Sequence, residues 1–499
     1  MNNTKDLITK AKKFYENKKF FEAKSYLLSA LKNEKLDDVT KLKLYVLISD
    51  ISYKVNDFND AEDYLLKYIK IDNSNSNVFT WLGNASQKKR NYVNSEKFYL
   101  KAVNLDENNE TALVNLAILY HNLGNQKEAI FFYKKVLDKN PRKIGALYNL
   151  SNLEKSIINN QTLASIRQLI NEKNLNNFDN ASCYFLLAEN EKNFDKEIDF
   201  LKDANYFSFK ENENKNKQSN EYWLNVIPKK FDKIEYPKEN KFSFNTKEIY
   251  PIFIVGLPRC GSTLIESIIS SGKDKVENLG ETNLVNWAFL NTNRNILKSS
   301  NNDDNKKNLN INFDITASKL INALENLNIK NDKKTFFSEK SLENFFYIEL
   351  ILNIYPNAKF INPYRSSIDN IFAIYKQFLS NVSWSHSIEN ILEYIDNYLH
   401  VIKYFKQRYP DKILSISLEN FTKDPINSSI ELFKFCNLQW DNKCLEFHKR
   451  NDLYTNTASN NQIRTSVQKY DKKKYKSYMI MLSSYLKKYD WVDFELKKL

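Results

Sequence analysis

The sequence predicts an α-helical repeat solenoid followed by an α/β domain with a central parallel sheet. The solenoid is predicted by a 34-residue period in the first 150 residues, and the α/β domain by strands that alternate with helices after residue 250. Glycine gives a third observation, because the 499-residue chain has seven glycines and four of them lie within residues 256–280. A chain of this length exceeds one typical core, so we expect more than one domain.

The repeat period is visible where small residues recur at the same position. Ala61, Ser95 and Ala129 follow one another at steps of 34 residues. Small residues let two antiparallel helices pack closely, and stacked pairs then bury a continuous core. The pattern resembles the tetratricopeptide repeat, and we expect residues 1–209 to form such repeats, with a degenerate last part. The resemblance implies a protein or peptide partner on the concave surface. Homodimerisation and simple support of the neighbouring domain are the alternatives.

Residues 210–249 are predicted to be a linker. The stretch is polar and charged, and Pro228 and Pro237 interrupt it, which disfavours a long helix. The expected domains are therefore residues 1–209 and residues 250–499, joined by this segment.

The glycine cluster contains a strand, a turn and a helix in that order. Residues 252–255 are apolar and indicate a buried strand, and the residues after the turn recur at helical spacing. Gly256 and Gly261 frame a turn that points backbone N–H groups and a helix N-terminus at one spot, which favours a bound phosphate. The turn is P-loop-like, but Ser262 stands where the nucleoside-triphosphate motif has its lysine. Arg259 supplies a cation inside the turn instead.

The remaining elements of the second domain alternate between strand and helix. Residues 291–313 are rich in Asn, Asp and Lys, lack periodicity and are predicted to be a mobile insertion. Strands are expected at residues 335–338, 358–361 and 413–418. Helices are expected at residues 342–354, 366–379, 388–405 and 425–435. This alternation favours a parallel sheet covered by helices on both faces.

Three basic residues, Arg259, Lys340 and Arg365, each come directly after a predicted strand or inside the turn that follows it. The carboxyl ends of parallel strands meet at one edge of a sheet, where α/β proteins bind their ligands. Taken singly, each could be an ordinary surface residue. Their shared position favours one crevice that attracts an anion.

Charge and cysteine content exclude several classes of function. The formal charge is +13, but the basic residues are spread among acidic ones, whereas a nucleic-acid binder gathers them on one face. The four cysteines and four histidines show no metal-ligand or disulfide spacing, so we expect neither a metal nor a disulfide framework. The first residues lack the apolar core of a signal peptide, and no apolar run is long enough to span a membrane. We therefore expect a cytoplasmic protein without a nucleic-acid partner and without a membrane span.

Five stretches of the second half resemble a known enzyme family. They are GLPRCGSTLIESII, LGET, SEKSLENFFYIELILNIYPNAKFINPYRSSIDNIFAIY, ISLENFTKDPINSSIELFKFCNLQW and NTASNNQIRTSVQ. In this order they resemble the sulfotransferases that use 3'-phosphoadenosine 5'-phosphosulfate, most closely the bacterial type with N-terminal tetratricopeptide repeats, akin to tyrosylprotein sulfotransferases. The resemblance covers most of residues 250–470. It implies transfer of a sulfuryl group to an acceptor hydroxyl, with a protein tyrosine as one candidate.

The resemblance also implies a role for each matching residue. Loop amides would hold the 5'-phosphosulfate together with Arg259, and these amides belong to Cys260, Gly261, Ser262 and Thr263. Arg365 would bind the 3'-phosphate. Glu281 would be the general base that takes the proton of the acceptor, Lys340 would stabilise charge on the bridging oxygen, and Ser459 would hydrogen-bond near the same centre. In-line transfer of such a charged group needs positioning and fixed cations, and no metal is implied.

Three positions depart from the family pattern. The family usually has serine where this chain has Cys260, and the tyrosylprotein enzymes have two glutamates where this chain has only Glu281. Ala373 replaces a serine that contacts the 3'-phosphate eight residues beyond Arg365. This last change keeps open an alternative function, a non-catalytic repeat scaffold with a degenerate nucleotide-binding domain. A P-loop kinase is disfavoured, because the loop lysine is missing.

Overall fold

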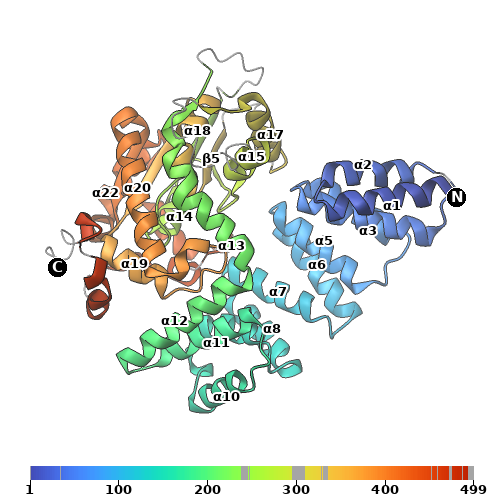
Figure 1. Cartoon of the computed structure of the whole chain (residues 1–499), viewed down its shortest axis with the longest axis horizontal. Helices are drawn as coiled ribbons and strands as arrows, with labels where there is room; N and C mark the ends of the chain where they lie inside the picture. Colours follow the sequence, from blue (N-terminus) through green and yellow to red (C-terminus); the bar gives the residue numbers. More distant parts are fainter. Residues whose placement is uncertain are drawn as a thin grey trace. The chain divides into compact units, whose positions relative to one another are not determined.

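The computed structural model describes residues 2–33, 35–237, 246, 248–294, 309–327, 329, 335–450, 452–457, 459–470, 475–485 and 487–492. The chain forms two compact units, and Figure 1 shows their helices and strands coloured along the sequence. One unit holds residues 1–121, 125–146 and 321–329. The other holds residues 122–124, 147–320 and 330–499.

The first part of the chain consists of paired helices, as the repeat prediction requires. They are α1 (Asn2–Glu16), α2 (Phe20–Leu31), α3 (Asp38–Lys54), α4 (Phe58–Ile69), α5 (Ser76–Lys88), α6 (Tyr92–Leu105), α7 (Glu110–Leu123) and α8 (Gln126–Lys139). The 34-residue period recurs in the caps, because Asp57 and Asn91 each accept a hydrogen bond from the first turn of the helix that follows. Packing explains the small residues. Ser95 donates to the carbonyl of Gly83 at 2.8 Å, and a Cβ on Gly83 would lie 2.4 Å from the Tyr99 ring.

The helices that continue this pattern belong mostly to the second unit. They are α9 (Ile144–Leu153), α10 (Asn160–Asn171), α11 (Asn177–Asn190) and α12 (Phe194–Glu211). Phe378 lies against the rings of Tyr148, Phe178 and Phe185, with ring centroids between 5.1 and 5.5 Å apart. Aromatic contacts of this kind bury large side chains from both segments. The unit boundary therefore lies near residue 147, earlier in the chain than the predicted boundary at residue 209.

The predicted linker, residues 210–249, contains more structure than its composition suggested. It includes helix α13 (Glu213–Asn220) and short helical turns after it. Glu213 pairs with Lys210 at 2.9 Å, so the charges partly compensate one another on the helix surface. Tyr222 is buried, and its hydroxyl lies 2.5 Å from that of Tyr347. A few buried aromatic side chains anchor this polar segment, a signal that average polarity conceals.

Five parallel strands form the sheet of the second unit, which confirms the predicted parallel sheet. They are β2 (Ile249–Ile254), β3 (Val276–Asn278), β5 (Thr335–Glu339), β6 (Lys359–Tyr364) and β7 (Ile413–Ser417), in the spatial order β3-β5-β2-β6-β7. Phe253 pairs with Glu339 on one side of β2, and Ile254 pairs with Ile361 on the other. The chain places β3 and β5 on one side of β2 and then β6 and β7 on the other. The strand order therefore reverses at β2, the point at which α/β sheets bind ligands.

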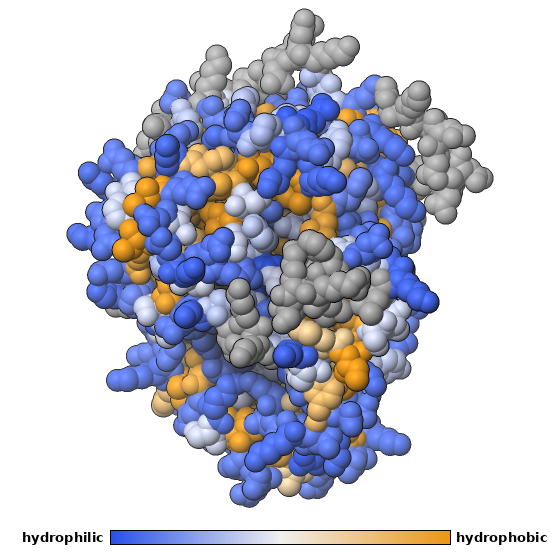
Figure 2. Space-filling view, turned by 90° about the vertical axis from the view of Figure 1, so that its left-hand side faces the viewer, coloured by the Kyte–Doolittle hydropathy of each residue, from blue (hydrophilic) through white to orange (hydrophobic). Residues whose placement is uncertain are grey.

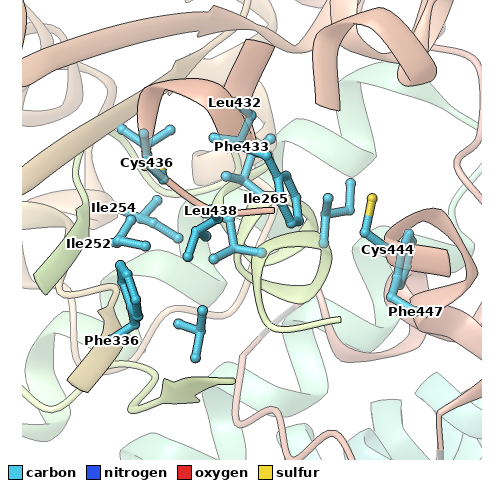
Figure 3. Close-up of a cluster of buried hydrophobic side chains, with 14 of the residues drawn as sticks. Ile252, Ile254, Ile265, Phe336, Leu432, Phe433, Cys436, Leu438, Cys444 and Phe447 are labelled. Atoms are coloured by element: carbon cyan, nitrogen blue, oxygen red, sulfur yellow. The ribbon is translucent and has the colours of Figure 1, made fainter. Parts of the chain in front are cut away.

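One face of this sheet packs against α14 (Ser262–Ile269) and α22 (Pro425–Phe435). Alternate residues of a strand point to opposite faces, and Ile252 and Ile254 join Ile265, Leu432 and Phe433 in one buried cluster, as Figure 3 shows. This cluster anchors the helix that follows the glycine turn. The turn is therefore fixed at both ends by buried elements, β2 before it and α14 after it.

The other face packs against helices that lie between α14 and α22 in the sequence. They are η6 (Leu342–Tyr347), α18 (Ile348–Ile354), α19 (Ser367–Tyr375) and α20 (Ile388–Arg408). The Tyr398 hydroxyl of α20 donates to Asn362 on β6 at 2.7 Å, and the Tyr398 ring meets that of Phe345 in η6 at 5.2 Å. After β7, α21 (Leu418–Lys423) leads to α22, which Asp424 caps as predicted. The strands and helices expected between residues 335 and 435 are thus present, and both faces of the sheet are covered.

The insertion predicted at residues 291–313 is described only at its ends. Helix α15 (Leu284–Thr292) precedes it and α17 (Phe313–Glu325) follows it, while its residues 295–308 lie outside the described part. The short strand β4 (Leu309–Asn310) pairs in parallel with β1 (Ile234–Glu235).

The surface of the molecule is mixed in character. Figure 2 shows one face, on which hydrophilic side chains surround separate hydrophobic patches. Within the described ranges, no helix combines the length and the apolar character needed to cross a membrane.

Candidate functional site

Four of the predicted site residues follow four neighbouring strands of the sheet. Glu281 comes after β3, Lys340 after β5, Arg259 after β2 and Arg365 after β6. Because all five strands are parallel, these residues lie at the same edge of the sheet. Ser459, which directly precedes η10 (Asn460–Arg464), reaches this edge from the C-terminal part of the chain.

The turn after β2 has a backbone that few side chains adopt. Gly256 and Gly261 have φ of +144° and +93°, and α14 begins directly after Gly261 at Ser262. A Cβ on Gly261 would lie 2.7 Å from Cδ1 of Leu418, so this position needs glycine for both its dihedral angle and its space. Arg259 has φ of +66° although it is not glycine. Such a conformation costs about 1–2 kcal/mol and is typical of functionally constrained positions.

The Arg259 side chain lies between a serine and a second arginine. Its Nη1 donates to Ser459 Oγ at 2.6 Å. Burial and the nearby charge of Arg365 lower the pKa of Arg259 from its ordinary value. A guanidinium keeps its proton in spite of such a shift. The two arginines therefore hold two positive charges close together.

Arg365 is oriented from several sides and still has a free donor. Its Nη2 donates to the carbonyl of Asp369 at 2.8 Å. The ring centroids of Tyr470 and Tyr475 lie 5.8 and 6.0 Å from its Cζ, which are cation–π distances. Its Nε is buried and has no hydrogen-bond partner among the described residues. A buried donor without a partner is costly, and a ligand acceptor would remove that cost.

A cavity of about 340 Å³ opens beside the turn, and we call it the loop cavity. Its walls include Arg259, Gly261, Thr263, Arg365, Ser459 and Lys469. Among the described residues that line it are three cations and no carboxylate. Ala373, where the family pattern has serine, lines it as well. Many donors without an acidic partner, in a cavity of ligand size, suit an anion.

Lys340 has the opposite environment. Its side chain is 0% exposed, and its Nζ lies 2.6 Å from Glu281 Oε1 and 4.0 Å from Glu266 Oε2. Burial by itself would lower the pKa of Lys340, but the two carboxylates outweigh it and raise the pKa above its ordinary value. Lys340 is therefore a charged lysine whose partner Glu281 is 44% exposed at its side chain.

A second buried carboxylate, Glu339, holds the turn that carries Glu281, and the sequence analysis did not single it out. Glu339 accepts hydrogen bonds from the Thr282 N–H at 3.1 Å, from the Thr282 hydroxyl at 2.8 Å and from Asn344 Nδ2 at 2.6 Å. The Ser341 N–H donates to it at 3.0 Å. Burial nevertheless raises the pKa of Glu339. Its partner Thr282 is 57 residues away in the chain, so only the tertiary fold reveals this contact.

Glu343 adds another carboxyl group near Lys340. Burial raises the pKa of Glu343 to about 7, and the charges of Glu281 and Glu339 add to the rise. Glu343 thus titrates near neutral pH. In the part of the chain that the structure describes, no three His, Cys, Asp or Glu residues are arranged so that they could hold a metal ion.

The structure brings most of the predicted residues together, but in two groups. Thr263 and Ser459 line the loop cavity with the two arginines. Lys340 and Glu281 do not line it and form their own ion pair. Cys260 is 1% exposed and borders a different cavity, and burial raises the pKa of its thiol.

Comparison with known proteins identifies the domain that carries these residues. A model of the sulfotransferase family matches residues 251–442. These residues form a sulfotransferase-family domain. Models of the tetratricopeptide repeat match residues 42–75, 76–109 and 98–131. The chain thus combines tetratricopeptide repeats with a sulfotransferase-family domain, as its motifs predicted, and the family match supports sulfotransfer in general.

Individual relatives are remote. An uncharacterised protein of Aquifex aeolicus (strain VF5) is 24% identical over 253 residues, which are 46% of this chain and 30% of that protein. The sulfotransferase domain of the Synechococcus PCC 7002 olefin synthase is 12% identical with a TM-score of 0.34, and the match covers 48% of this chain and 92% of that one. The sulfotransferase domain from the curacin biosynthetic pathway is 16% identical with a TM-score of 0.29, covering 45% and 85% of the two chains.

Proposed function

We propose that this protein transfers a sulfuryl group from 3'-phosphoadenosine 5'-phosphosulfate to an acceptor hydroxyl. One observation carries the proposal: the described residues that line the loop cavity, at the point where the strand order reverses, include three cations and no carboxylate. A ligand with several negative charges would satisfy these donors, whereas a neutral ligand would leave them uncompensated.

The residues present fit the two charged ends of such a donor. The 5'-phosphosulfate would lie at the N-terminus of α14, where Gly261 leaves the backbone accessible and Arg259 adds a guanidinium. The 3'-phosphate would lie at Arg365, whose Nε has no acceptor among the described residues. Thr263 and Ser459 would add hydroxyl groups along the wall.

The transfer itself would use the second group of residues. The acceptor oxygen forms a bond to sulfur while the bond from sulfur to the bridging oxygen breaks, and 3'-phosphoadenosine 5'-phosphate leaves. The proton of the acceptor hydroxyl passes to Glu281, the partly exposed carboxylate of this edge. Lys340 is fixed by its ion pair and would stabilise the charge on the bridging oxygen.

The acceptor and the partner are also proposals. Tetratricopeptide repeats support a protein or peptide partner, so a protein tyrosine is the first acceptor to test. A cytoplasmic location, a homodimer through the repeats and the absence of a metal requirement stay predictions from the sequence.

A second candidate function rests on Ala373. This residue lines the loop cavity beside Arg365 but offers no hydrogen-bond donor to a 3'-phosphate. If the missing contact abolishes donor binding, the domain is a scaffold and the repeats carry the function. Donor affinity therefore separates the two candidates.

The test measures donor binding and transfer with matched arginine variants. Calorimetric titration with 3'-phosphoadenosine 5'-phosphate should give a complex that Arg259→Ala and Arg365→Ala each weaken about 10–100-fold, the value of a lost charge-assisted hydrogen bond. Arg408→Ala is the control, because Arg408 pairs with Glu349 outside the loop cavity. Labelled phosphosulfate should then pass its label to tyrosine peptides, glycans or small alcohols. A wild-type protein that binds neither nucleotide, or variants that bind as the wild type does, would contradict the proposal.

A further inference from the structure

A second and larger cavity lies on the other side of Arg365. Its volume is about 570 Å³, and α20 forms one wall while the ends of β6 and β7 form another. We call it the α20 cavity. Its size falls in the range of small-molecule sites, and apart from Arg365 and Cys260 none of its lining residues has a role in the proposed donor binding.

The charges around the α20 cavity have one sign. Arg365, Lys403 and Lys406 line it, and the described lining residues include no carboxylate. Lys403 and Lys406 lie three residues apart, so they share one face of α20. Within the described residues, neither lysine forms an ion pair with a carboxylate. Their charges are therefore available to an anion.

Part of the remaining wall is apolar and aromatic, and polar side chains such as Ser367 and Gln407 complete it. Leu257, Pro363, Leu399 and Ile402 line the cavity together with the ring of Tyr398. Burial of an apolar group against such a surface contributes about 25 cal/mol per Å². A ligand that contacts both the basic residues and the apolar residues of the cavity carries an anionic group at one end and an apolar or aromatic group at the other.

Buried hydrogen bonds fix the cavity before any ligand arrives. Asn362 is 3% exposed and accepts from the Tyr398 hydroxyl at 2.7 Å, and its Nδ2 donates to Ser415 Oγ at 3.3 Å. Asn370 is 1% exposed and donates to the carbonyl of Pro258 at 2.6 Å. The bond from Asn370 to Pro258 connects α19 to the turn that shapes the loop cavity. Fixed walls of this kind lower the cost of binding, because few side chains must be ordered.

From these contacts we infer that the α20 cavity binds an organic sulfate or phosphate monoester with an apolar or aromatic group, and that this ligand weakens donor binding. Arg365 lines both cavities. An anion beside it on one side reduces its attraction for an anion on the other, and the coupling is reciprocal. The binding half of this inference is independent of the proposed donor. Only the coupling half rests on the proposed function.

The experiment uses phenyl sulfate, phenyl phosphate and uncharged phenol as probes of the full-length protein. The first two probes should bind in calorimetric titration and phenol should not, and their ratio tells whether a sulfated product or a phosphate ester suits the site better. The double variant Lys403→Ala/Lys406→Ala should weaken the charged probes about tenfold and leave 3'-phosphoadenosine 5'-phosphate affinity unchanged. Arg259→Ala should do the reverse, because Arg259 lines the loop cavity alone.

Two controls make the outcome decisive. Lys423→Ala/Lys434→Ala removes the same charge from exposed positions on α21 and α22, and it should leave both affinities unchanged. With wild-type protein, saturating phenyl sulfate should weaken nucleotide binding about fivefold, and the Lys403/Lys406 variant should lose this effect. Probe binding that survives the double variant, or that disappears in Arg259→Ala, would place the probe in the loop cavity and overturn the inference. Failure of nucleotide binding alone would contradict only the proposed function.

Discussion

The loop cavity and the ion pair of Lys340 with Glu281 differ in whether the fold compensates their positive charges. In the loop cavity, Arg259 and Arg365 lie near each other with hydroxyl groups, aromatic rings and backbone around them and no lining carboxylate. Lys340 lies within 4.0 Å of two carboxylates, Glu281 and Glu266. Both groups belong to the same edge of one sheet.

This difference indicates which cations are available to bind a ligand. A cation that the fold compensates keeps its position and protonation state by itself, as Lys340 does. Cations that the fold leaves uncompensated raise the free energy of the empty site. A bound anion lowers that free energy again. The first arrangement suits a residue that acts at a fixed point, and the second suits a binding site.

The largest effect is expected when the compensated cation is removed. Lys340→Met leaves the buried carboxylate of Glu266 and the partly exposed carboxylate of Glu281 without their cation. We expect the transfer rate to fall about 10²–10³-fold and the free energy of unfolding to fall by about 3–5 kcal/mol. Single-turnover transfer and urea denaturation measure the two quantities. Lys24→Met is the matched control, since Lys24 also lies between two carboxylates, those of Asp57 and Asp60, but in the repeats. A Lys340→Met protein with wild-type transfer would refute the role of this cation.

An intermediate effect is expected when the backbone of the binding side is changed. Gly261→Ala forces a side chain into φ of +93° and against Leu418, so nucleotide affinity should fall about tenfold. Gly280→Ala is the counterpart on the other side, with φ of +67° and no atom within 4 Å of the added Cβ. It should alter transfer through its neighbour Glu281 and leave nucleotide affinity near the wild-type value. Equal losses of nucleotide affinity in both variants would contradict the separate roles of the loop cavity and the Lys340–Glu281 pair.

The smallest effect concerns pH and Glu343. Its pKa of about 7 exceeds the ordinary value of a carboxyl group, so the folded state holds a proton that the unfolded chain has released. The resulting stability is complete at low pH and is lost as pH rises toward and through 7. Glu343→Gln should therefore flatten the fall in unfolding free energy between about pH 4.5 and pH 7 and stabilise the protein at pH 8 by about 1–2 kcal/mol.

Urea denaturation at several pH values measures the Glu343 effect. The exposed residue Glu431 on α22 provides the control variant Glu431→Gln. A Glu343→Gln protein with the same pH slope as the wild type would show that Glu343 is solvated.

Local patterns predicted much of this molecule. The strands, the turn after β2 and the helix α14 follow from apolar runs and glycine positions that lie within a few residues of one another. The edge that holds Arg259, Lys340 and Arg365 follows from their common place after strands. The 34-residue repeats follow from the spacing of small residues.

Contacts between distant segments could not be predicted in the same way. Glu339 accepts a hydrogen bond from Thr282, which is 57 residues away in the chain. Such a contact depends on how closely the segments after β3 and β5 approach each other. Phe378 makes aromatic contacts with α9 and α11, so these helices pack with the second unit. The change to a polar composition near residue 209 does not reveal this packing. The segment predicted as a linker contains helix α13 and the buried ring of Tyr222, which its average polarity did not reveal.

The left-handed backbone of Arg259 sets a limit on how this protein can change. A glycine at that position would relieve the strain and make the chain more stable, yet it would also delete the guanidinium bonded to Ser459. Selection for stability and selection for the proposed donor binding would therefore favour different residues at this position. The buried core around Ile265 and Phe433 holds the helix after the turn, so the strained residue is followed by a firmly packed element.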